Sequence, residues 1–320
     1  MNSESQAIDE IALLEQMLLV RAYEEAIVAG SVAGKIPGSC TSVGQEAAGV
    51  GVVSALHGDD LILTNHRSAA HLLARGADPG RLLAEVMGRA TGYCKGKSGS
   101  LHISVRELGV MLTSTIVGGE LSLVTGVALS QKMLGRTGIV TCFFGDGAAC
   151  EGIFHESLNL ASVWELPILY VCENNQWQAF VHRRETMKTE HVADWAAPYG
   201  IDHATVDGND VLAVRNAALE AAEQVRRSGR PFLLETWTYR SRGHFEPDDQ
   251  AYVDPTEHAA WLARDPIALS RQRLIDSGRL PREEAVALER RVRECIAAAL
   301  AFAEASPLPA PGEMTTDVYA

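Results

Sequence analysis

Short apolar runs alternate with amphipathic stretches along most of the chain. The runs at 61–63, 139–144, 166–172 and 232–238 are continuous, which is typical of strands buried on both faces of a parallel sheet. Residues 203–206 form a further short candidate strand. Because strands that alternate with helices build parallel sheets covered on both sides, the pattern predicts an α/β fold with a mostly parallel sheet and helices on both faces.

The stretches between these runs predict helices. Residues 45–56 are rich in Ala, Gly and Val, which favours close contact with another helix or subunit. Glycine-rich residues 92–99 and polar residues 241–254 predict loops. Helices are expected over residues 7–30, 45–56, 67–75, 79–89, 120–134, 148–164, 211–227, 266–276 and 281–305.

Nothing in the sequence divides the chain. No linker rich in Pro, Gly or Ser and no internal repeat interrupts it, so we expect one domain over residues 1–320, with an N-terminal helix at about 1–30 and a helical C-terminal extension at about 258–320. Hydrophobic residues make up 47% of the chain, enough for a sizeable core.

Charge and cysteine usage exclude several classes of protein. A net charge of −13 argues against nucleic acid and anionic membranes as partners. No apolar run is long enough to span a membrane, and the N-terminus lacks a signal-peptide pattern. The six cysteines show no CxxC spacing, which favours a reducing cytoplasm over a disulfide scaffold or a zinc site.

Two polar motifs follow neighbouring apolar runs. Gly145-Asp146-Gly147 comes directly after the run at 139–144, and Asn174-Asn175 comes after the run at 166–172. A carboxylate and an amide oxygen suit Mg²⁺, which takes its other ligands from phosphate and water, and a helix beginning after Gly147 would aim free N–H groups at the same place. A tight turn and an Asn loop cap are the simpler alternative, but the separation of 29 positions (175 − 146) favours a magnesium–diphosphate site.

A third polar pair, His66-Arg67, follows the run at 61–63. An arginine at the end of a strand is well placed to bind a phosphate with two N–H groups. A surface ion pair is the alternative interpretation.

Taken together, these motifs resemble the thiamine-diphosphate motif. The chain is similar to alpha subunits of the decarboxylating first component of 2-oxo acid dehydrogenase complexes, and most closely to the acetoin dehydrogenase type. The resemblance implies the thiamine-diphosphate-binding fold with a helical C-terminal segment. It extends over nearly the whole chain and includes Ile36-Pro37-Gly38, Gly44-Gln45-Glu46-Ala47, His66-Arg67, Ala90–Lys97, Ile116–Gly119, Val206–Asp210, Thr238-Tyr239-Arg240, Arg242–Glu246 and Thr316–Ala320.

The resemblance also implies roles for individual residues. Mg²⁺ would be held by Asp146, Asn175 and the backbone carbonyl of Trp177. Ile116 and Val117 would lie beneath the bent cofactor, although Val117 also suits an ordinary core. His244, in the polar loop, would reach the diphosphate and the substrate as a catalytic residue. The remaining cofactor contacts would come from His66, Arg67, Gly145, Gly147 and Ala148.

Two positions depart from the family pattern. Cys40 stands where the family commonly has a histidine four residues before its GQEA motif, and Ala69 stands where relatives read His-Arg-x-His. Both missing imidazoles would face the substrate. His71, one helical turn beyond Arg67, or His244 could take over their catalytic role. The cofactor half of the site is therefore intact, and the substrate half is altered.

The activity implied is thiamine-diphosphate- and Mg²⁺-dependent cleavage of a 2-oxo acid or an acetoin-like hydroxyketone, with transfer of the acyl unit to a lipoyl group. The partners implied are a separate beta subunit in an α2β2 assembly, which supplies the activating Glu, and a lipoyl acyltransferase component. Two alternatives stay open: a biosynthetic homologue that transfers an acyl anion without a lipoyl complex, and a cofactor-binding scaffold without turnover.

Overall fold

The computed structural model describes residues 9–318 and contains one six-stranded sheet in which every neighbouring pair is parallel. Residues 7 and 8 of the expected N-terminal helix and the last two residues of the C-terminal motif lie outside the described residues. The expected α/β class is confirmed. In spatial order the strands are β2 (Val110–Ser114), β1 (Leu61–Asn65), β3 (Val140–Gly145), β4 (Ile168–Asn174), β8 (Phe232–Trp237) and β7 (Asp202–Asp207).

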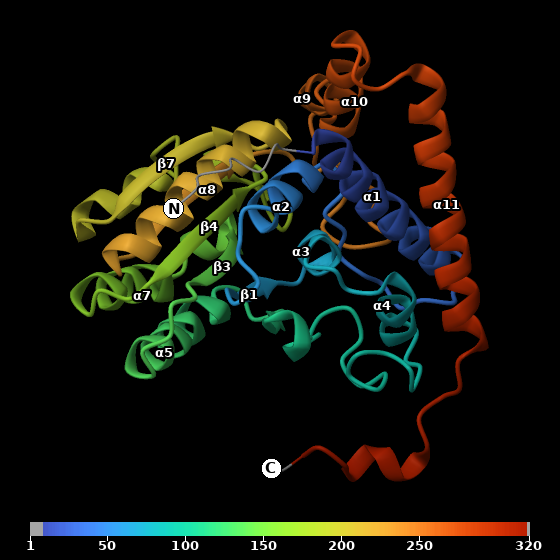
Figure 1. The fold of residues 1–320 in the computed structure, drawn as a ribbon, viewed down its shortest axis with the longest axis horizontal. Helices are drawn as coiled ribbons and strands as arrows, with labels where there is room; N and C mark the ends of the chain where they lie inside the picture. The colour runs from blue at the N-terminus through green and yellow to red at the C-terminus, as the bar shows by residue number, and fades with distance from the viewer. Residues whose placement is uncertain (1–8, 319–320) are drawn as a thin grey trace, which may run out of the picture.

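Helices cover both faces of this sheet (Figure 1). Successive side chains of β3 point to opposite faces, so Phe143 packs into one core and Cys142 and Phe144 into the other. Both faces are buried, which explains why the strand sequences are continuously apolar. One face carries α1 (Glu10–Val32), α2 (Glu46–Val53), α3 (Ala69–Ala74), α4 (Pro79–Val86), α8 (Val211–Ser228), α10 (Pro266–Asp276) and α11 (Arg282–Ala305), and the other carries α5 (Gly119–Met133) and α7 (Gly152–Val163).

The connections around β1 create a crevice. From β1 the chain passes through α3 and α4 to the outer strand β2, and then returns to β3 on the opposite side of β1. The connection that leaves β1 therefore leads to one side of β1, and the connection that leaves β2 leads to the other side. Ligands of open α/β sheets bind at the carboxyl ends of the strands at such a switch point.

Strand β2 and three helices are among the elements that differ from the sequence-based expectation. Strand β2 was not predicted because its five residues mix apolar and hydroxyl side chains. The helix expected over 148–164 is two helices, α6 (Asp146–Ala149) and α7, because Glu151 has an extended backbone with ψ 144° and sits at the N-cap of α7. Helix α9 (Pro255–Leu262) is additional, and its sequence signal was Asp254, which caps it, followed by proline at the first helical position.

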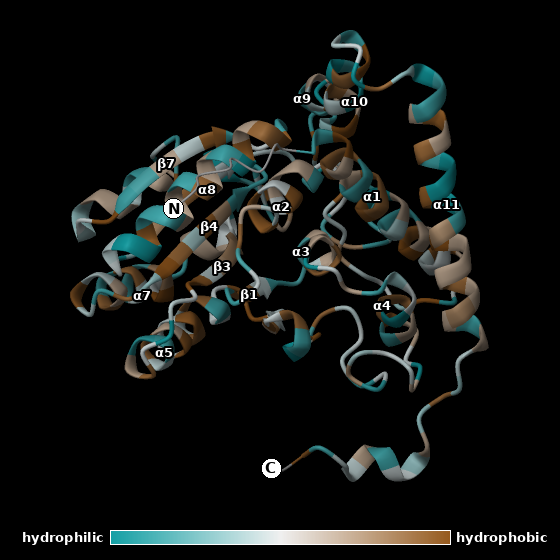
Figure 2. Cartoon of the chain, in the orientation of Figure 1, coloured by the Kyte–Doolittle hydropathy of each residue, from teal (hydrophilic) through white to brown (hydrophobic). Residues whose placement is uncertain are grey.

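The C-terminal part is helical, as expected. Helix α11 packs along α1 and α4, and Figure 2 shows hydrophobic and hydrophilic patches alternating along it. Its buried residues include Leu288, Val292 and Ile296, spaced four apart as on one face of an amphipathic helix. Beyond α11 the chain continues into a short turn of 3₁₀ helix, Pro311–Thr315 (Figure 1). No helix in residues 9–318 is both long enough and apolar enough to cross a membrane.

Candidate active site

A cavity of about 330 Å³ lies at the carboxyl ends of β1, β3, β4 and β8. Its walls come from the residues that follow these strands, from the segment before α5 and from the loop after β8. All eleven residues expected to bind the cofactor line it: His66, Arg67, Ile116, Val117, Gly145, Asp146, Gly147, Ala148, Asn175, Trp177 and His244.

Asp146 occupies the end of β3 and begins α6. Its side chain is buried, and its Oδ2 atom accepts no hydrogen bond from the described residues. Burial raises the pKa of Asp146 to about 7, against the opposing influence of Arg240 and Arg183. An unpaired buried carboxylate oxygen is costly on its own, and a bound cation would both satisfy it and favour the charged form.

Asn175 follows β4 and is held in place on both sides of its amide. Its Nδ2 donates to Gln45 Oε1 at 3.0 Å, and its Oδ1 accepts from the backbone N–H of Trp177 at 3.1 Å. Trp177 begins the short hairpin of β5 (Trp177–Gln178) and β6 (Val181–His182). Among the described residues no group of three or more His, Cys, Asp or Glu could hold a metal, so a cation here would depend on Asp146 and neutral oxygen ligands.

Arg67 is buried at the end of β1 and has no carboxylate hydrogen-bond partner in residues 9–318. Its Nη1 donates to the carbonyl of Thr41 at 2.6 Å, and its Nη2 donates to the carbonyl of His244 at 2.8 Å. Burial lowers the pKa of Arg67. The side chain thus connects the strand end to the polar loop after β8 and brings positive charge to the cavity wall.

Arg240 was not predicted as a site residue, although it follows β8 as Arg67 follows β1. It is buried and lines the cavity, where its Nη2 donates to the carbonyl of Ala179 at 2.9 Å and to the Tyr252 hydroxyl at 2.8 Å. Burial, reinforced by the charge of Arg67, lowers its pKa to about 10. The strand-end argument applied to Arg67 would have found it.

Burial, together with the same positive charge, holds the two cavity histidines neutral. Burial and Arg67 lower the pKa of His66 to about 3 and that of His244 to about 4. The two rings lie edge to face with centroids 6.0 Å apart, and the backbone N–H of His244 donates to Asp248 at 2.6 Å. Near neutral pH both rings can therefore accept or donate one hydrogen bond without carrying charge.

His71 lies outside the cavity. It is fully buried, its Nε2 lies 3.0 Å from Glu173 Oε1, its Nδ1 lies 2.7 Å from the Thr64 hydroxyl, and its ring stacks on Phe143. Glu173 lines the cavity, whereas His71 does not. His71 is therefore placed to hold Glu173 in position and not to contact a substrate.

Ile116 and Val117 lie at the rim. The two residues are 69% and 54% exposed, which are high values for aliphatic residues. Glu120, in the first turn of α5, also lines the cavity but was not predicted; it is buried, its Oε2 has no partner among the described residues, and burial raises its pKa to about 7. The other lining residues missed from sequence are Gln45, Asn65, Ser114, Cys150, Glu151, Glu173, Gln178, Ala179 and Arg240.

The two positions that lack the expected imidazoles come together. Cys40 and Ala69 line a second, much smaller cavity of about 20 Å³. His66 belongs to the walls of both cavities. The space that the two missing imidazoles would fill therefore lies beside His66, which also lines the main cavity.

The fold and this cavity define the class of protein, and sequence comparison agrees. The chain belongs to the family of dehydrogenase E1 components, whose family model matches residues 15–312. The expected enzyme class is confirmed: thiamine-diphosphate-dependent oxidoreductases of the acetoin and 2-oxo acid dehydrogenase type, which work with a separate beta subunit.

Individual relatives match along nearly the whole chain. The alpha subunit of acetoin:2,6-dichlorophenolindophenol oxidoreductase from Bacillus subtilis is 40% identical over 312 residues, which are 96% of this chain and 92% of that one. The subunit of the same name from Cupriavidus necator is 38% identical, with 97% and 93% covered. Pyruvate dehydrogenase E1 component subunit alpha from Rhizobium meliloti is 36% identical, with 97% and 90% covered.

Proposed function

We propose that this chain is the single-domain alpha subunit of a thiamine-diphosphate- and Mg²⁺-dependent enzyme that cleaves an acetoin-like hydroxyketone or a 2-oxo acid and passes the acyl unit to a lipoyl acceptor. The observation that carries the proposal is the pairing, in one cavity, of an unsatisfied buried carboxylate, Asp146, with two buried guanidinium groups, Arg67 and Arg240. One end of such a cavity suits a cation, and the guanidinium groups suit an anion.

The donor set fits magnesium diphosphate. Asp146, Asn175 and the carbonyl of Trp177 would hold the cation, whose preference is for oxygen ligands. The diphosphate would be met by Arg67, by Arg240 and by the backbone N–H groups of Gly147 and Ala148 at the beginning of α6. When bound, thiamine diphosphate supplies the carbanion that attacks the substrate carbonyl and stabilises the charge left by bond cleavage.

The protein's own groups then position the substrate. His66 and the catalytic candidate His244, both neutral near pH 7, can orient the substrate oxygen by a hydrogen bond at a ring nitrogen. Ile116 and Val117 support the ring portion of the cofactor from the rim. Glu173, held by His71 and Asn65, is a further polar group in the wall.

A second chain completes the site. The exposed side chains of Ile116, Val117, Phe180 and Phe245 lie on cavity-wall segments or within a few residues of them, and exposed apolar groups beside a functional cavity mark a protein interface. We propose that this surface receives a beta subunit in an α2β2 assembly, in the cytoplasm, and that a lipoyl acyltransferase is the downstream partner.

The altered substrate half favours a hydroxyketone such as acetoin over pyruvate. Groups that act as general acids or bases typically contribute about 10²–10⁴ in rate, and Cys40 and Ala69 cannot supply the imidazoles expected at their positions. The test is kcat/KM of the reconstituted complex for pyruvate, branched 2-oxo acids, acetoin and larger acyloins, with an artificial electron acceptor. We expect acetoin or a larger acyloin to be preferred.

The variant Cys40→His/Ala69→His tests the cause of that preference. Pyruvate activity should rise when both imidazoles are restored. A clear preference of the unmodified complex for pyruvate would contradict the proposed substrate. Turnover with an acyl acceptor other than a lipoyl group would favour the alternative of a biosynthetic acyl-transfer enzyme.

A further inference from the structure

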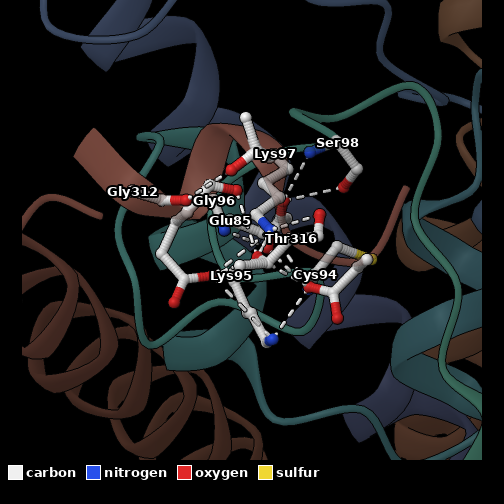
Figure 3. A network of polar contacts seen from close by, with 11 residues as sticks. Glu85, Cys94, Lys95, Gly96, Lys97, Ser98, Gly312 and Thr316 are labelled. Atoms are coloured by element: carbon white, nitrogen blue, oxygen red, sulfur yellow. Dashed lines mark hydrogen bonds and ion pairs between the residues drawn. The ribbon is translucent and has the colours of Figure 1, made fainter. Parts of the chain in front are cut away.

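A buried carboxylate organises the loop between α4 and β2. Glu85, near the end of α4, is fully buried. Its Oε2 accepts the backbone N–H groups of Cys94 and Gly96 at 2.7 and 2.9 Å, and its Oε1 accepts the backbone N–H and the hydroxyl of Ser98, both at 2.8 Å (Figure 3). One side chain thus satisfies three backbone donors of a loop that has little regular structure of its own.

The C-terminal segment contacts the same loop at Lys95 and Lys97. Lys97 Nζ donates to Thr316 Oγ1 at 2.8 Å and to Asp317 Oδ2 at 3.0 Å, and lies 3.3 Å from Glu313 Oε2. Lys95 Nζ lies 2.8 Å from Asp317 Oδ2. Figure 3 shows Lys95, Lys97 and Thr316 converging around the Glu85 loop.

The contact extends to the beginning of the loop. The backbone N–H of Ala90 donates to the carbonyl of Pro307 at 2.9 Å, and the Thr91 hydroxyl donates to the Ser306 hydroxyl at 2.7 Å. Residues 306–317, here termed the C-terminal strap, therefore bind the beginning and the middle of the loop, about 220 positions away in sequence.

The loop in turn touches the wall of the small second cavity and the rim of the active-site cavity. The Ser39 hydroxyl donates to the Ser100 hydroxyl at 3.1 Å, next to Cys40. His102 Nε2 lies 3.2 Å from the Thr115 hydroxyl, directly before Ile116 in the rim. A displacement of the loop would move the segments at Ser39 and Thr115, because a hydrogen bond connects the loop directly to each of them.

We propose that the C-terminal strap is a positioning clamp for the active site. Its acidic residues, by docking on Lys95 and Lys97, hold the 90–102 loop. Through this loop they hold Ser39-Cys40, in the wall of the second cavity, and Thr115–Val117, at the rim of the active-site cavity. The ion pairs are exposed, so each is weak and is screened by salt. The clamp is therefore able to open without unfolding of the domain. The clamp acts on the cavity itself and does not depend on the cofactor or substrate proposed for it.

The test uses the full-length chain and the variant Lys95→Glu/Lys97→Glu. Hydrogen exchange resolved by peptide is measured over residues 90–105 and 113–118, together with the rate at which Cys40 is alkylated. Losing several exposed ion pairs should speed exchange in both segments about fivefold or more and should speed alkylation of Cys40. Adding Glu313→Lys and Asp317→Lys should restore slow exchange by re-forming the pairs with opposite signs.

The control is Arg290→Glu, which reverses the charge of a still more exposed residue on α11 that pairs only with Glu294 among the described residues. It should leave both segments unchanged. Raising NaCl to about 1 M should reproduce the double variant in the unmodified chain. If residues 113–118 and Cys40 keep their rates while residues 90–105 exchange faster, or if nothing changes, the clamp is refuted.

Discussion

At the scale of single residues, cation binding depends on Asp146 Oδ2, which has no hydrogen-bond partner in residues 9–318. We predict that Asp146→Ala abolishes binding of thiamine diphosphate with Mg²⁺ to the complex while the fold persists, because the side chain lies at a strand end rather than in an apolar core. Calorimetry measures the affinity, and thermal unfolding checks the fold. Asp202→Ala, at the exposed amino end of β7, is the control. Unchanged affinity in Asp146→Ala would contradict the metal assignment.

Arg240 provides a second prediction at this scale. A hydrogen bond to a charged group contributes about 1.5–3 kcal/mol, so Arg240→Ala should weaken diphosphate binding by roughly tenfold to a hundredfold. Arg242→Ala is the matched control: Arg242 is two positions away but pairs with Glu246 and does not line the cavity. Equal losses in the two variants would point to a general disturbance of the loop rather than to anion binding.

At the scale of elements, small residues in α2 decide how closely the helices behind the site approach. The sequence left open whether they serve a helix or a subunit contact, and the structure shows a helix contact within the chain. An added Cβ at Gly49 would lie 2.6 Å from Ala70 Cβ and close to the His71 ring, and one at Gly51 would lie 2.7 Å from Val214. Gly49 therefore sets the position of α3, which follows Arg67 and carries His71.

We predict that Gly49→Ala lowers the free energy of unfolding by about 1–2 kcal/mol, since overpacking outweighs the gain in helix propensity. Gly126→Ala, in α5, is the comparison, because an added Cβ there meets no atom within 4 Å. It should stabilise the protein by about 0.4–1 kcal/mol. Denaturant unfolding of both variants measures the two changes in the free energy of unfolding. A stabilised Gly49→Ala would show that α2 and α3 are free to separate.

At the scale of the whole molecule, the open rim implies that the chain does not turn over alone. Purified without a partner it should show no cleavage of acetoin or 2-oxo acids, and activity should appear when its beta chain is added. Ile116→Asp should weaken that association, because it places a charge on the exposed apolar rim. Full activity of the isolated chain would refute the subunit assignment.

Met133→Asp is the control for the association experiment. Met133 is also strongly exposed, but it lies at the C-terminal end of α5, whereas Ile116 lies just before its start. A helix rises about 1.5 Å per residue, so the two positions are roughly 20 Å apart. Loss of association in both variants would place the partner along the whole of α5 instead of at the cavity rim.

The sequence by itself determined five of the six strands of the sheet and the strand-end half of the site. Strands buried on both faces must be continuously apolar, and polar residues at their carboxyl ends must meet at one edge of a parallel sheet, so Arg67, Asp146 and Asn175 could be placed together from order alone. Ile116 and Val117 were placed by resemblance to a family. Short strand β2, with its mixed side chains, and the helix break at Glu151 were missed because local patterning there is weak.

Only the tertiary structure decided the contacts between segments that are distant in sequence. It placed His71 behind Glu173 rather than in the cavity, brought Arg240 to the wall, joined Cys40 with Ala69 and docked the C-terminal strap on Lys95 and Lys97. Periodicity records which face of an element is buried, but it does not record which side chain lies opposite. That depends on how helices and loops pack over the sheet, through contacts between residues that the sequence alone does not pair.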